Sequence, residues 1–444
     1  MGKLLSAADS RCWIQMPVIE GILPALVTPF RGEELDTEAL RSLVEHLIGR
    51  GVSGVVVAGT TGEFPYLSME ERKAALEAVV DQVNGRVPVV AGAGASSTSE
   101  AVEHARVAED IGADALLVVS PYYFKPSEKG IYQHYLELMS RVELPVLAYN
   151  IPQCTGYYIP RSVLEDLAAE GLSGVKDSSG NLPYLAEVAS YLKGKATVLC
   201  GHDEVVLSAL VLGASGAILA SANVIPEVWL RVYKAFKEGR LEEARTMQAR
   251  AQKLARLIAR HGPLAVKAAL RDLGLPAGRC RSPLEPGGSL PREVREEIRL
   301  ELAKLGAVPM ELPAEAEVYI EVEAGPKDSE VGYRWARELA RPKAFREALL
   351  AVAEPNLAAR PPTLIVPEVD VRSLRQASMV YGPVQAAVAR AVIDSIGSVI
   401  PPEACETHVI IARVKLSPSL VDRGAVYWSA YRGMLKALKE VKWG

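Results

Sequence analysis

The sequence contains few cysteines for its length. Five cysteines occur in 444 residues, and no two of them are spaced as a CxxC pair. They are Cys12, Cys154, Cys200, Cys280 and Cys405. An odd and scattered set of this kind argues against a disulfide framework and against a zinc site, so we expect no bound metal.

The sequence also lacks a large excess of charge of one sign, and it lacks long apolar runs. The formal net charge is −4, which gives no electrostatic basis for binding nucleic acid or an anionic membrane. No apolar run reaches the roughly 20 residues of a membrane-spanning helix. Residues 1–18 lack the long apolar segment of a secretory signal peptide, and we interpret them as an N-terminal extension. These features predict a cytoplasmic protein with neither nucleic acid nor membrane as a partner.

Short apolar runs are present instead, and eight of them alternate with longer amphipathic stretches. Their nearly continuous apolar character is typical of parallel strands that are covered on both faces. The runs are 21–30, 53–60, 87–94, 114–123, 144–150, 172–179, 197–201 and 216–222.

The stretches between the runs have helical spacing and residues that cap helices. Asp36, Ser68 and Ser97–Ser99 each precede such a stretch, and Gly112 ends one. Eight strand–helix repeats in this order predict an α/β fold, a (β/α)8 TIM barrel.

A chain of 444 residues is too long for a barrel of about 250 residues alone. We assign the barrel to 19–308, with extra helices from about 226 to 305, and a linker to 309–315. Apolar and polar residues then alternate over 317–325, which indicates a half-buried strand. The elements that follow predict a smaller α+β domain over 316–444.

Lys176 is the residue with the clearest chemical meaning in the barrel, because active sites of such barrels lie where the strands end. Lys176 ends the sixth apolar run. Desolvation favours the neutral amine of a lysine, and a neutral amine can attack a ketone to form an imine. The alternative is a lysine that extends to the rim and pairs with Asp177.

Two neighbouring strand ends carry residues that fit the same chemistry. The phenol of Tyr149 can relay protons, although a tyrosine at a barrel rim can also be satisfied by water. Thr60 and Thr61 lie between two glycines, where backbone N–H groups and hydroxyls can hold a carboxylate. A plain turn is the alternative for that segment.

Together these motifs resemble the family of dihydrodipicolinate synthase and N-acetylneuraminate lyase over about residues 19–306. The matching stretches are GTTGE at 59–63, SPYYFKPSEKGIYQHY at 120–135, YNIPQCTG at 149–156 and GVKDSSGN at 174–181. The resemblance implies a class I pyruvate-dependent aldolase or lyase that needs no cofactor beyond a lysine imine.

The resemblance also implies roles for single residues. Lys176 forms the imine with pyruvate or another 2-oxo acid, and Tyr149 relays protons. Thr60, which also belongs to the proton path, and Thr61 hold the carboxylate. Tyr123 reaches the site of a neighbouring subunit, and members are usually homotetramers. The last two implied positions, whose backbones line the pyruvate pocket, are Gly201 and Ile218.

Cys154 departs from the synthase branch of the family. That branch has an arginine at this position, which holds the carboxylate of the aldehyde substrate. A thiol cannot form the bidentate contact of a guanidinium. We therefore favour an aldolase of the superfamily over 4-hydroxy-tetrahydrodipicolinate synthase, which condenses pyruvate with aspartate semialdehyde and is retained as the alternative.

The second domain resembles the formaldehyde-activating enzyme family over about residues 316–436. The matching pieces are YIEVEAGP at 319–326, LLAVAEPNLAARPPTL at 349–364 and RQASMVYGPVQAAVARAV at 375–392. The resemblance implies formaldehyde condensation with tetrahydromethanopterin.

The positions where that chemistry is performed differ from the family pattern. Tyr319 stands in place of the catalytic histidine and Glu321 in place of an aspartate, and a phenol is a poor proton carrier at neutral pH. Leu350 and Gln385 match positions that contact the pterin. A lysine and a threonine of the family fall on Glu368 and Asp370.

Three hypotheses for the whole chain follow from these observations. The first is a 2-oxo acid aldolase with an appended domain of doubtful activity. The second is a bifunctional protein whose barrel releases formaldehyde for the second domain. The third keeps the second domain as a non-catalytic assembly or sensing module.

Overall fold

The chain consists of two compact units, Met1–Met310 and Glu311–Gly444. The computed structural model describes residues 19–284, 290–307, 318–340, 349–354, 357–367, 380–416 and 423–443. Each unit is described by itself. The division at 308 and 316 that the sequence suggests stays a prediction.

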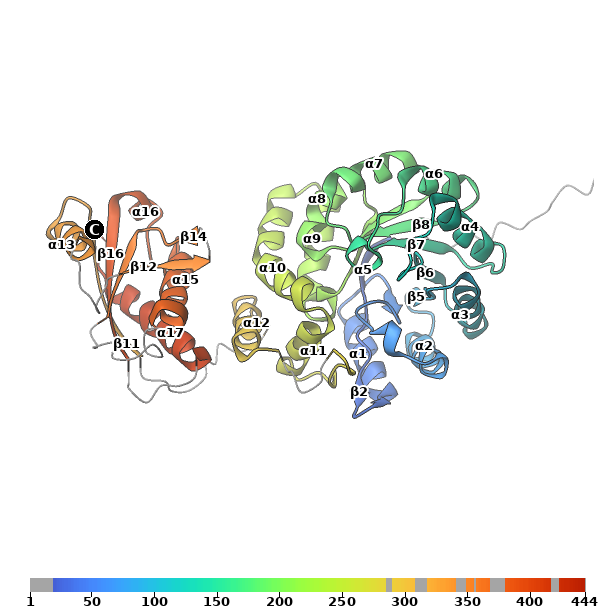
Figure 1. Ribbon diagram of the computed structural model, residues 1–444, viewed down its shortest axis with the longest axis horizontal. Coiled ribbons are helices and arrows are strands. Elements are labelled where there is room, and N and C mark those ends of the chain that lie inside the picture. Colours follow the sequence, from blue (N-terminus) through green and yellow to red (C-terminus); the bar gives the residue numbers. More distant parts are fainter. Residues whose placement is uncertain are drawn as a thin grey trace, which may run out of the picture. The chain divides into compact units, whose positions relative to one another are not determined.

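The first unit is a closed barrel of eight parallel strands (Figure 1). Around the sheet the order is β1, β10, β9, β8, β7, β6, β5 and β4, and a parallel bridge from Ala25 to Val56 joins the first strand to the last. The predicted TIM barrel is confirmed. Its strands are β1 Gly21–Pro24, β4 Val55–Val57, β5 Val89–Gly92, β6 Ala115–Val119, β7 Val146–Asn150, β8 Gly174–Asp177, β9 Thr197–Cys200 and β10 Gly216–Leu219.

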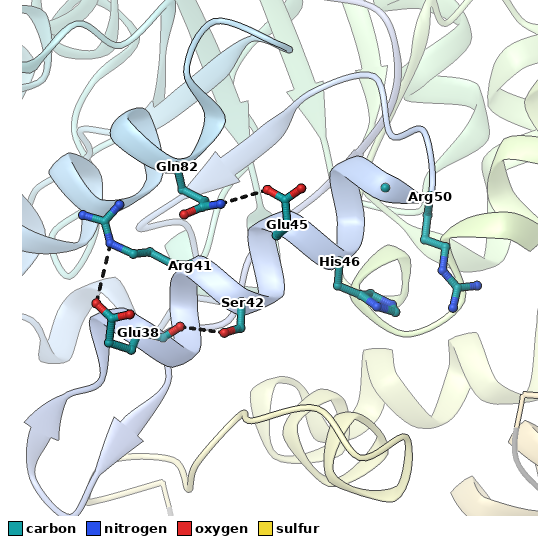
Figure 2. Close-up of a pocket in the computed structure, with 8 residues that line it drawn as sticks. Glu38, Arg41, Ser42, Glu45, His46, Arg50 and Gln82 are labelled. Atoms are coloured by element: carbon teal, nitrogen blue, oxygen red, sulfur yellow. Dashed lines mark hydrogen bonds and ion pairs between the residues drawn. The ribbon is translucent and has the colours of Figure 1, made fainter.

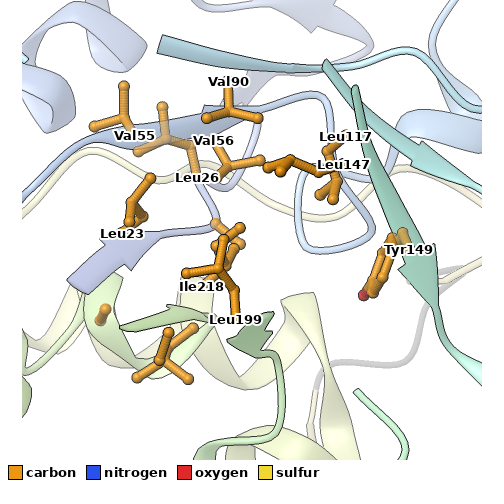
Figure 3. Close-up of a cluster of buried hydrophobic side chains, with 14 of the residues drawn as sticks. Leu23, Leu26, Val55, Val56, Val90, Leu117, Leu147, Tyr149, Leu199 and Ile218 are labelled. Carbon is orange, nitrogen blue, oxygen red and sulfur yellow. The ribbon is translucent and has the colours of Figure 1, made fainter. Parts of the chain in front are cut away.

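The strands are apolar along their length because both of their faces are covered. Inside the ring, side chains from different strands pack against one another, among them Leu23, Val56, Leu117 and Leu199 (Figure 3). Each of these four is at most 2% exposed. The barrel centre is therefore a packed core, and the space for a ligand lies at the strand ends.

Helices with local capping signals connect the strands. The Asp36 carboxylate accepts from the Ala39 N–H at 3.0 Å, and Ser68 with Glu71 forms a reciprocal capping box. The connecting helices are α1 Thr37–Gly49, α2 Met69–Val83, α3 Thr98–Ile111, α4 Glu128–Met139, α6 Arg161–Ala169, α7 Leu182–Leu192, α8 Val206–Val211 and α9 Pro226–Lys237.

Three more helices follow the eighth repeat, and they begin at Leu241 rather than at about 226, because α9 is the helix of the eighth repeat. They are α10 Leu241–His261, α11 Pro263–Asp272 and α12 Arg292–Lys304. Shorter elements lie in the connections, namely β2 Phe30–Arg31, β3 Glu34–Leu35, η1 Phe64–Tyr66, α5 Pro152–Thr155, η2 Asp203–Val205 and η3 Ser221–Asn223.

The second unit is an α+β domain built on a four-stranded sheet of order β11, β16, β15, β12. Strand β11 pairs antiparallel with β16, and β15 runs parallel to β16. The elements are β11 Val318–Pro326, α13 Glu330–Leu339, β12 Leu349–Leu350, β13 Val352–Glu354, β14 Leu357–Ala358, β15 Thr363–Pro367, η4 Val380–Val384, α15 Gln385–Ser395, α16 Ala404–Thr407, β16 His408–Leu416 and α17 Arg423–Glu440.

The alternation in β11 has the predicted consequence for packing. The backbone N–H of Val318 donates to Ser429 of α17 at 3.0 Å, and a side chain at Gly433 of the same helix would contact Ile320. Glu321, on the opposite face, is exposed. Within the described ranges, each helix of either unit is too short or not apolar enough to span a membrane.

Candidate active site

Lys176 and Tyr149 lie side by side at the carboxyl ends of adjacent strands. The register of β7 and β8 pairs these two residues directly. Lys176 Nζ lies 4.3 Å from the centroid of the Tyr149 ring, and each residue is only 4% exposed. The lysine amine therefore lies at a strand end against an aromatic face and is largely shielded from water.

Ser178 connects these two residues to the end of β9. Its hydroxyl donates to the Gly201 carbonyl oxygen at 2.9 Å and lies 3.4 Å from the Tyr149 phenol oxygen. A Cβ atom on Gly201 would stand 2.7 Å from Lys176 Cε and 2.1 Å from Ser178 Oγ. Only glycine leaves room for the lysine here, so Gly201 contributes its backbone to the site.

Two buried carboxylates lie at the ends of neighbouring strands, Asp177 next to Lys176 in sequence and Asp203 after β9. Asp177 accepts from the Asn150 amide at 2.7 Å and from the Ser179 hydroxyl at 2.9 Å. Asp203 accepts from the Ser221 N–H at 2.8 Å. Burial raises the pKa of both carboxyl groups above the ordinary value, against the opposing effect of these hydrogen bonds.

The turn after β4 carries Thr60 and Thr61 at the same end of the barrel. Its backbone is closed by a hydrogen bond from the Glu63 N–H to the Thr60 carbonyl at 3.0 Å. The Thr28 hydroxyl donates to the Gly62 carbonyl at 2.6 Å. Both threonines are partly exposed, so their hydroxyls are accessible to a ligand.

Tyr123 lies on the surface, whereas Ile218 belongs to the same cluster of buried side chains as Tyr149 (Figure 3). Tyr123 is 86% exposed, has a positive φ of 78° and packs edge-on against Phe124. It therefore belongs to the surface of its own chain. Ile218 is 1% exposed in β10, opposite Leu23 of β1, and so forms part of the barrel core near the strand ends.

Cys154 lies in the short helix α5 that follows β7. Its side chain is exposed and forms no disulfide with the other described cysteines. The neighbouring Gln153 amide donates to the Ser178 carbonyl at 2.8 Å, which holds this helix against the strand that carries Lys176. Residue 154 is thus presented at the rim of the site.

The second-unit candidates are described only in part. The Gln385 amide donates to the Leu350 carbonyl at 2.8 Å, so these two positions are adjacent. Tyr319 lies in β11 opposite Lys415, two residues before Glu321. Glu368 and Asp370 lie outside the described residues.

A polar surface pocket lies over helices α1 and α2, away from the strand ends (Figure 2). Its charged groups bind one another or nearby residues, for example Arg41 with Asp81 at 2.5 Å and Glu45 with Arg86 at 2.7 Å. We therefore do not treat it as a site. The described residues contain no group of three or more His, Cys, Asp or Glu side chains that could hold a metal ion.

Sequence reasoning missed two contributors to the site. Ser178 follows Lys176 by two residues, and the period of two along a strand could have identified it. Lys267 forms a buried ion pair with Glu63 at 2.6 Å. A single lysine in an otherwise apolar stretch of helix α11 was the available signal.

Comparisons with known proteins agree with this geometry. A model of the dihydrodipicolinate synthetase family matches residues 18–304, and one of formaldehyde-activating enzyme (Fae) matches residues 310–441. The 4-hydroxy-tetrahydrodipicolinate synthase of Methanopyrus kandleri is 41% identical over 296 residues, which cover 66% of this chain and 98% of that protein. The enzyme of the same name from Methanocaldococcus jannaschii is 40% identical over 270 residues, or 60% of this chain and 93% of that protein.

A solved structure gives the same result. The crystal structure of the chloride-inhibited dihydrodipicolinate synthase of Acinetobacter baumannii, complexed with pyruvate, is 36% identical to this chain with a TM-score of 0.63. The likeness covers 65% of this chain and 100% of that one. By the extent of these matches, the chain belongs to the dihydrodipicolinate synthetase family and is a carbon–carbon lyase of that family.

Proposed function

We propose that the barrel binds pyruvate, or another 2-oxo acid, as an imine on Lys176 and makes or breaks a carbon–carbon bond beside it. The observation that carries this proposal is the buried lysine at a strand end, 4.3 Å from the centroid of the Tyr149 ring. The relatives named above are enzymes or structures of the same family, and one of them is complexed with pyruvate.

The chemistry follows from the imine. The amine attacks the keto carbon, and loss of water leaves a protonated imine. That imine withdraws electrons from the neighbouring carbon, which loses a proton and then adds to the carbonyl carbon of an aldehyde. Cleavage runs through the same steps in reverse, and water finally hydrolyses the imine to free Lys176.

The neighbouring residues would serve these steps. The Tyr149 phenol would carry protons to and from the oxygen that leaves or forms, with the Ser178 hydroxyl beside it. Thr60 and Thr61 would hold the carboxylate of the 2-oxo acid, because their turn presents hydroxyls and backbone N–H groups at the same barrel end.

Reduction with borohydride in the presence of pyruvate tests the imine. We expect a three-carbon adduct on Lys176, identified by peptide mass spectrometry. Lys176→Met should give no adduct, whereas the matched change of a surface lysine, Lys193→Met, should leave it intact. A wild-type protein without the adduct, or an adduct that persists in Lys176→Met, would contradict the proposal.

Cys154 bears on the aldehyde partner. We propose an aldehyde without a carboxylate, because an exposed thiol at the rim offers no guanidinium to bind one. The synthase reaction with aspartate semialdehyde is the alternative, which the names of the relatives favour. Turnover with a panel of aldehydes at fixed pyruvate distinguishes them, and a clear preference for aspartate semialdehyde would reject our choice.

The exposed aromatic pair supports a further part of the proposal. Tyr123 and Phe124 are 86% and 79% exposed at the barrel end that carries the site. We propose that this surface meets a second copy of the chain in a homotetramer, where Tyr123 completes the proton path of the neighbouring site.

A second candidate function rests on the match of residues 310–441 to formaldehyde-activating enzyme. The barrel would cleave a hydroxymethyl 2-oxo acid, such as 4-hydroxy-2-oxobutanoate, into pyruvate and formaldehyde, and the second unit would take up the aldehyde. Leu350 and Gln385 lie together and would contact tetrahydromethanopterin. We derive no reaction step on tetrahydromethanopterin, because Tyr319 stands where the family has its catalytic histidine.

Release of free formaldehyde from 4-hydroxy-2-oxobutanoate tests the second candidate. We expect formaldehyde and pyruvate in equal amounts, and Gln385→Ala should leave this release unchanged. If the protein does not turn over 4-hydroxy-2-oxobutanoate, the second candidate function is wrong.

A further inference from the structure

A buried ion pair connects the turn of Thr60 and Thr61 to a helix outside the eight repeats. Lys267 Nζ of helix α11 lies 2.6 Å from Glu63 Oε1, and the two side chains are 1% and 0% exposed. The pair spans 204 positions of the sequence. Further hydrogen bonds hold both groups, because Lys267 also donates to the Arg279 carbonyl at 2.7 Å and the Arg281 N–H donates to Glu63 Oε2 at 2.8 Å.

Aromatic and cationic groups surround this pair. Lys267 Nζ lies 4.6 Å from the centroid of the Phe30 ring, and the Arg281 guanidinium lies 4.3 Å from the same centroid. Arg281 also donates to the Tyr66 carbonyl and to Glu71. Helix α11 and the segment after it therefore hold Glu63 and the residues that follow it from several directions.

The backbone of the turn is in a conformation that side chains disfavour. Ala58, just before the turn, has a φ of 54°, and Glu63, its last residue, has a φ of 58°. Left-handed residues other than glycine are strained and persist where the surroundings enforce them. At Glu63 the enforcing contacts are visible, since its carboxylate is held at both oxygens.

The position of Glu63 is transmitted to the threonines through the main chain. Its N–H donates to the Thr60 carbonyl at 3.0 Å, and the Gly62 N–H donates to the Gly59 carbonyl at 3.0 Å. A rotation of Glu63 out of its left-handed conformation would break the first bond and turn the Thr60–Thr61 peptide. The hydroxyls and N–H groups of the turn would then no longer point toward the same place.

We propose that Glu63 and Lys267 are positioning residues that hold the Thr60–Thr61 turn in the shape that receives the carboxylate of the 2-oxo acid. This inference rests on the proposed function, because it assumes that the turn binds that carboxylate. Neither residue touches the substrate. The ion pair affects how tightly the turn binds the carboxylate of the 2-oxo acid. It does not change the reactivity of Lys176.

Trapping experiments with two ketones distinguish a positioning role of the ion pair from general damage to the site. Pyruvate carries a carboxylate and acetone does not, yet both can form an imine that borohydride reduces. In Lys267→Met we expect the pyruvate concentration for half-maximal trapping on Lys176 to rise about tenfold or more. Acetone should be trapped as in the wild type. Lys253→Met is the matched control, because Lys253 pairs with Glu297 and Glu301 between α10 and α12.

A double variant distinguishes a loss of stability from a loss of pyruvate binding. Lys267→Met leaves a buried unpaired carboxylate and should lower the melting temperature, whereas Glu63→Met with Lys267→Met removes both charges. We expect the double variant to recover most of the melting temperature and to keep the weakened trapping of pyruvate. Recovery of both together would show a purely structural role and overturn the inference.

The remaining outcomes are also decisive. An equal loss of pyruvate and acetone trapping in Lys267→Met would overturn the positioning role while leaving the proposed function standing. A wild-type protein that forms no pyruvate adduct on Lys176 would refute the proposed function and the inference with it.

Discussion

At the scale of single residues, the candidate site is a small set of side chains brought together by strand register. Lys176 and Tyr149 are opposite each other because β7 and β8 are parallel neighbours whose ends align. The glycine at 201 is required by space, since any side chain would overlap Lys176 and Ser178. The rim at residue 154 is less constrained, because that residue is on an exposed short helix.

Cys154→Arg is therefore the most informative change at this scale. A guanidinium at the rim can form two charge-assisted hydrogen bonds with the carboxylate of aspartate semialdehyde. We expect kcat/KM for that aldehyde to rise roughly tenfold or more. The readout is steady-state turnover with pyruvate in excess. Cys154→Met controls for size, and an equal effect of both changes would show that charge is not the reason.

Short motifs predicted those parts of the site that each lie within a single strand or in the turn after it. Lys176, Tyr149 and the Thr60–Thr61 turn follow from short stretches of sequence, and their roles stay predictions until tested. Lys267 could not be assigned in this way. It is 204 positions from Glu63, and its helix looks like any other apolar helix until the fold brings the two together.

At the scale of elements, helices α3 and α4 contain two buried histidines. His134 is 2% exposed, its Nδ1 lies 3.0 Å from the Thr98 hydroxyl, and its Nε2 has no hydrogen-bond partner among the described residues. Burial lowers the pKa of His134 to about 4, and burial with the nearby Arg72 does the same for His104. The folded barrel thus favours neutral imidazoles in both positions.

These histidines predict a loss of stability in mild acid. Between the unfolded pKa near 6.5 and the folded pKa near 4, the unfolded chain binds more protons than the folded one. The free energy of unfolding should therefore fall as pH drops through this window, by roughly 3 kcal/mol for His134 alone at full titration. Urea unfolding at several pH values measures it. His134→Gln should show a shallower fall than the wild type, and identical slopes would contradict the assignment.

At the scale of the whole molecule, two compact units are joined in one chain. The described contacts of the candidate lysine site involve residues of Met1–Met310 only. The match to formaldehyde-activating enzyme, by contrast, lies in the second unit. Lys176, Tyr149 and the turn of Thr60 and Thr61 therefore all belong to the first unit.

Removal of residues 311–444 tests the division of labour. We expect the truncated chain to trap pyruvate on Lys176 at the same half-saturating concentration as the full chain, because none of the groups around the amine is removed. Light scattering on both proteins reports the number of chains per particle. A lower number after truncation would assign an assembly role to the second unit, and an unchanged number would exclude it. Loss of trapping would contradict a self-sufficient barrel.

The sequence by itself determined the barrel, its eight strands and the lysine at the end of the sixth. Apolar runs, caps and short motifs are local, and local patterns suffice where neighbouring strands in sequence are also neighbours in space. The tertiary structure decided which distant side chains hold the site together. Glu63 meets Lys267 only because helix α11 and the segment after it pack against the turn after β4, and no local pattern encodes a contact across 204 positions.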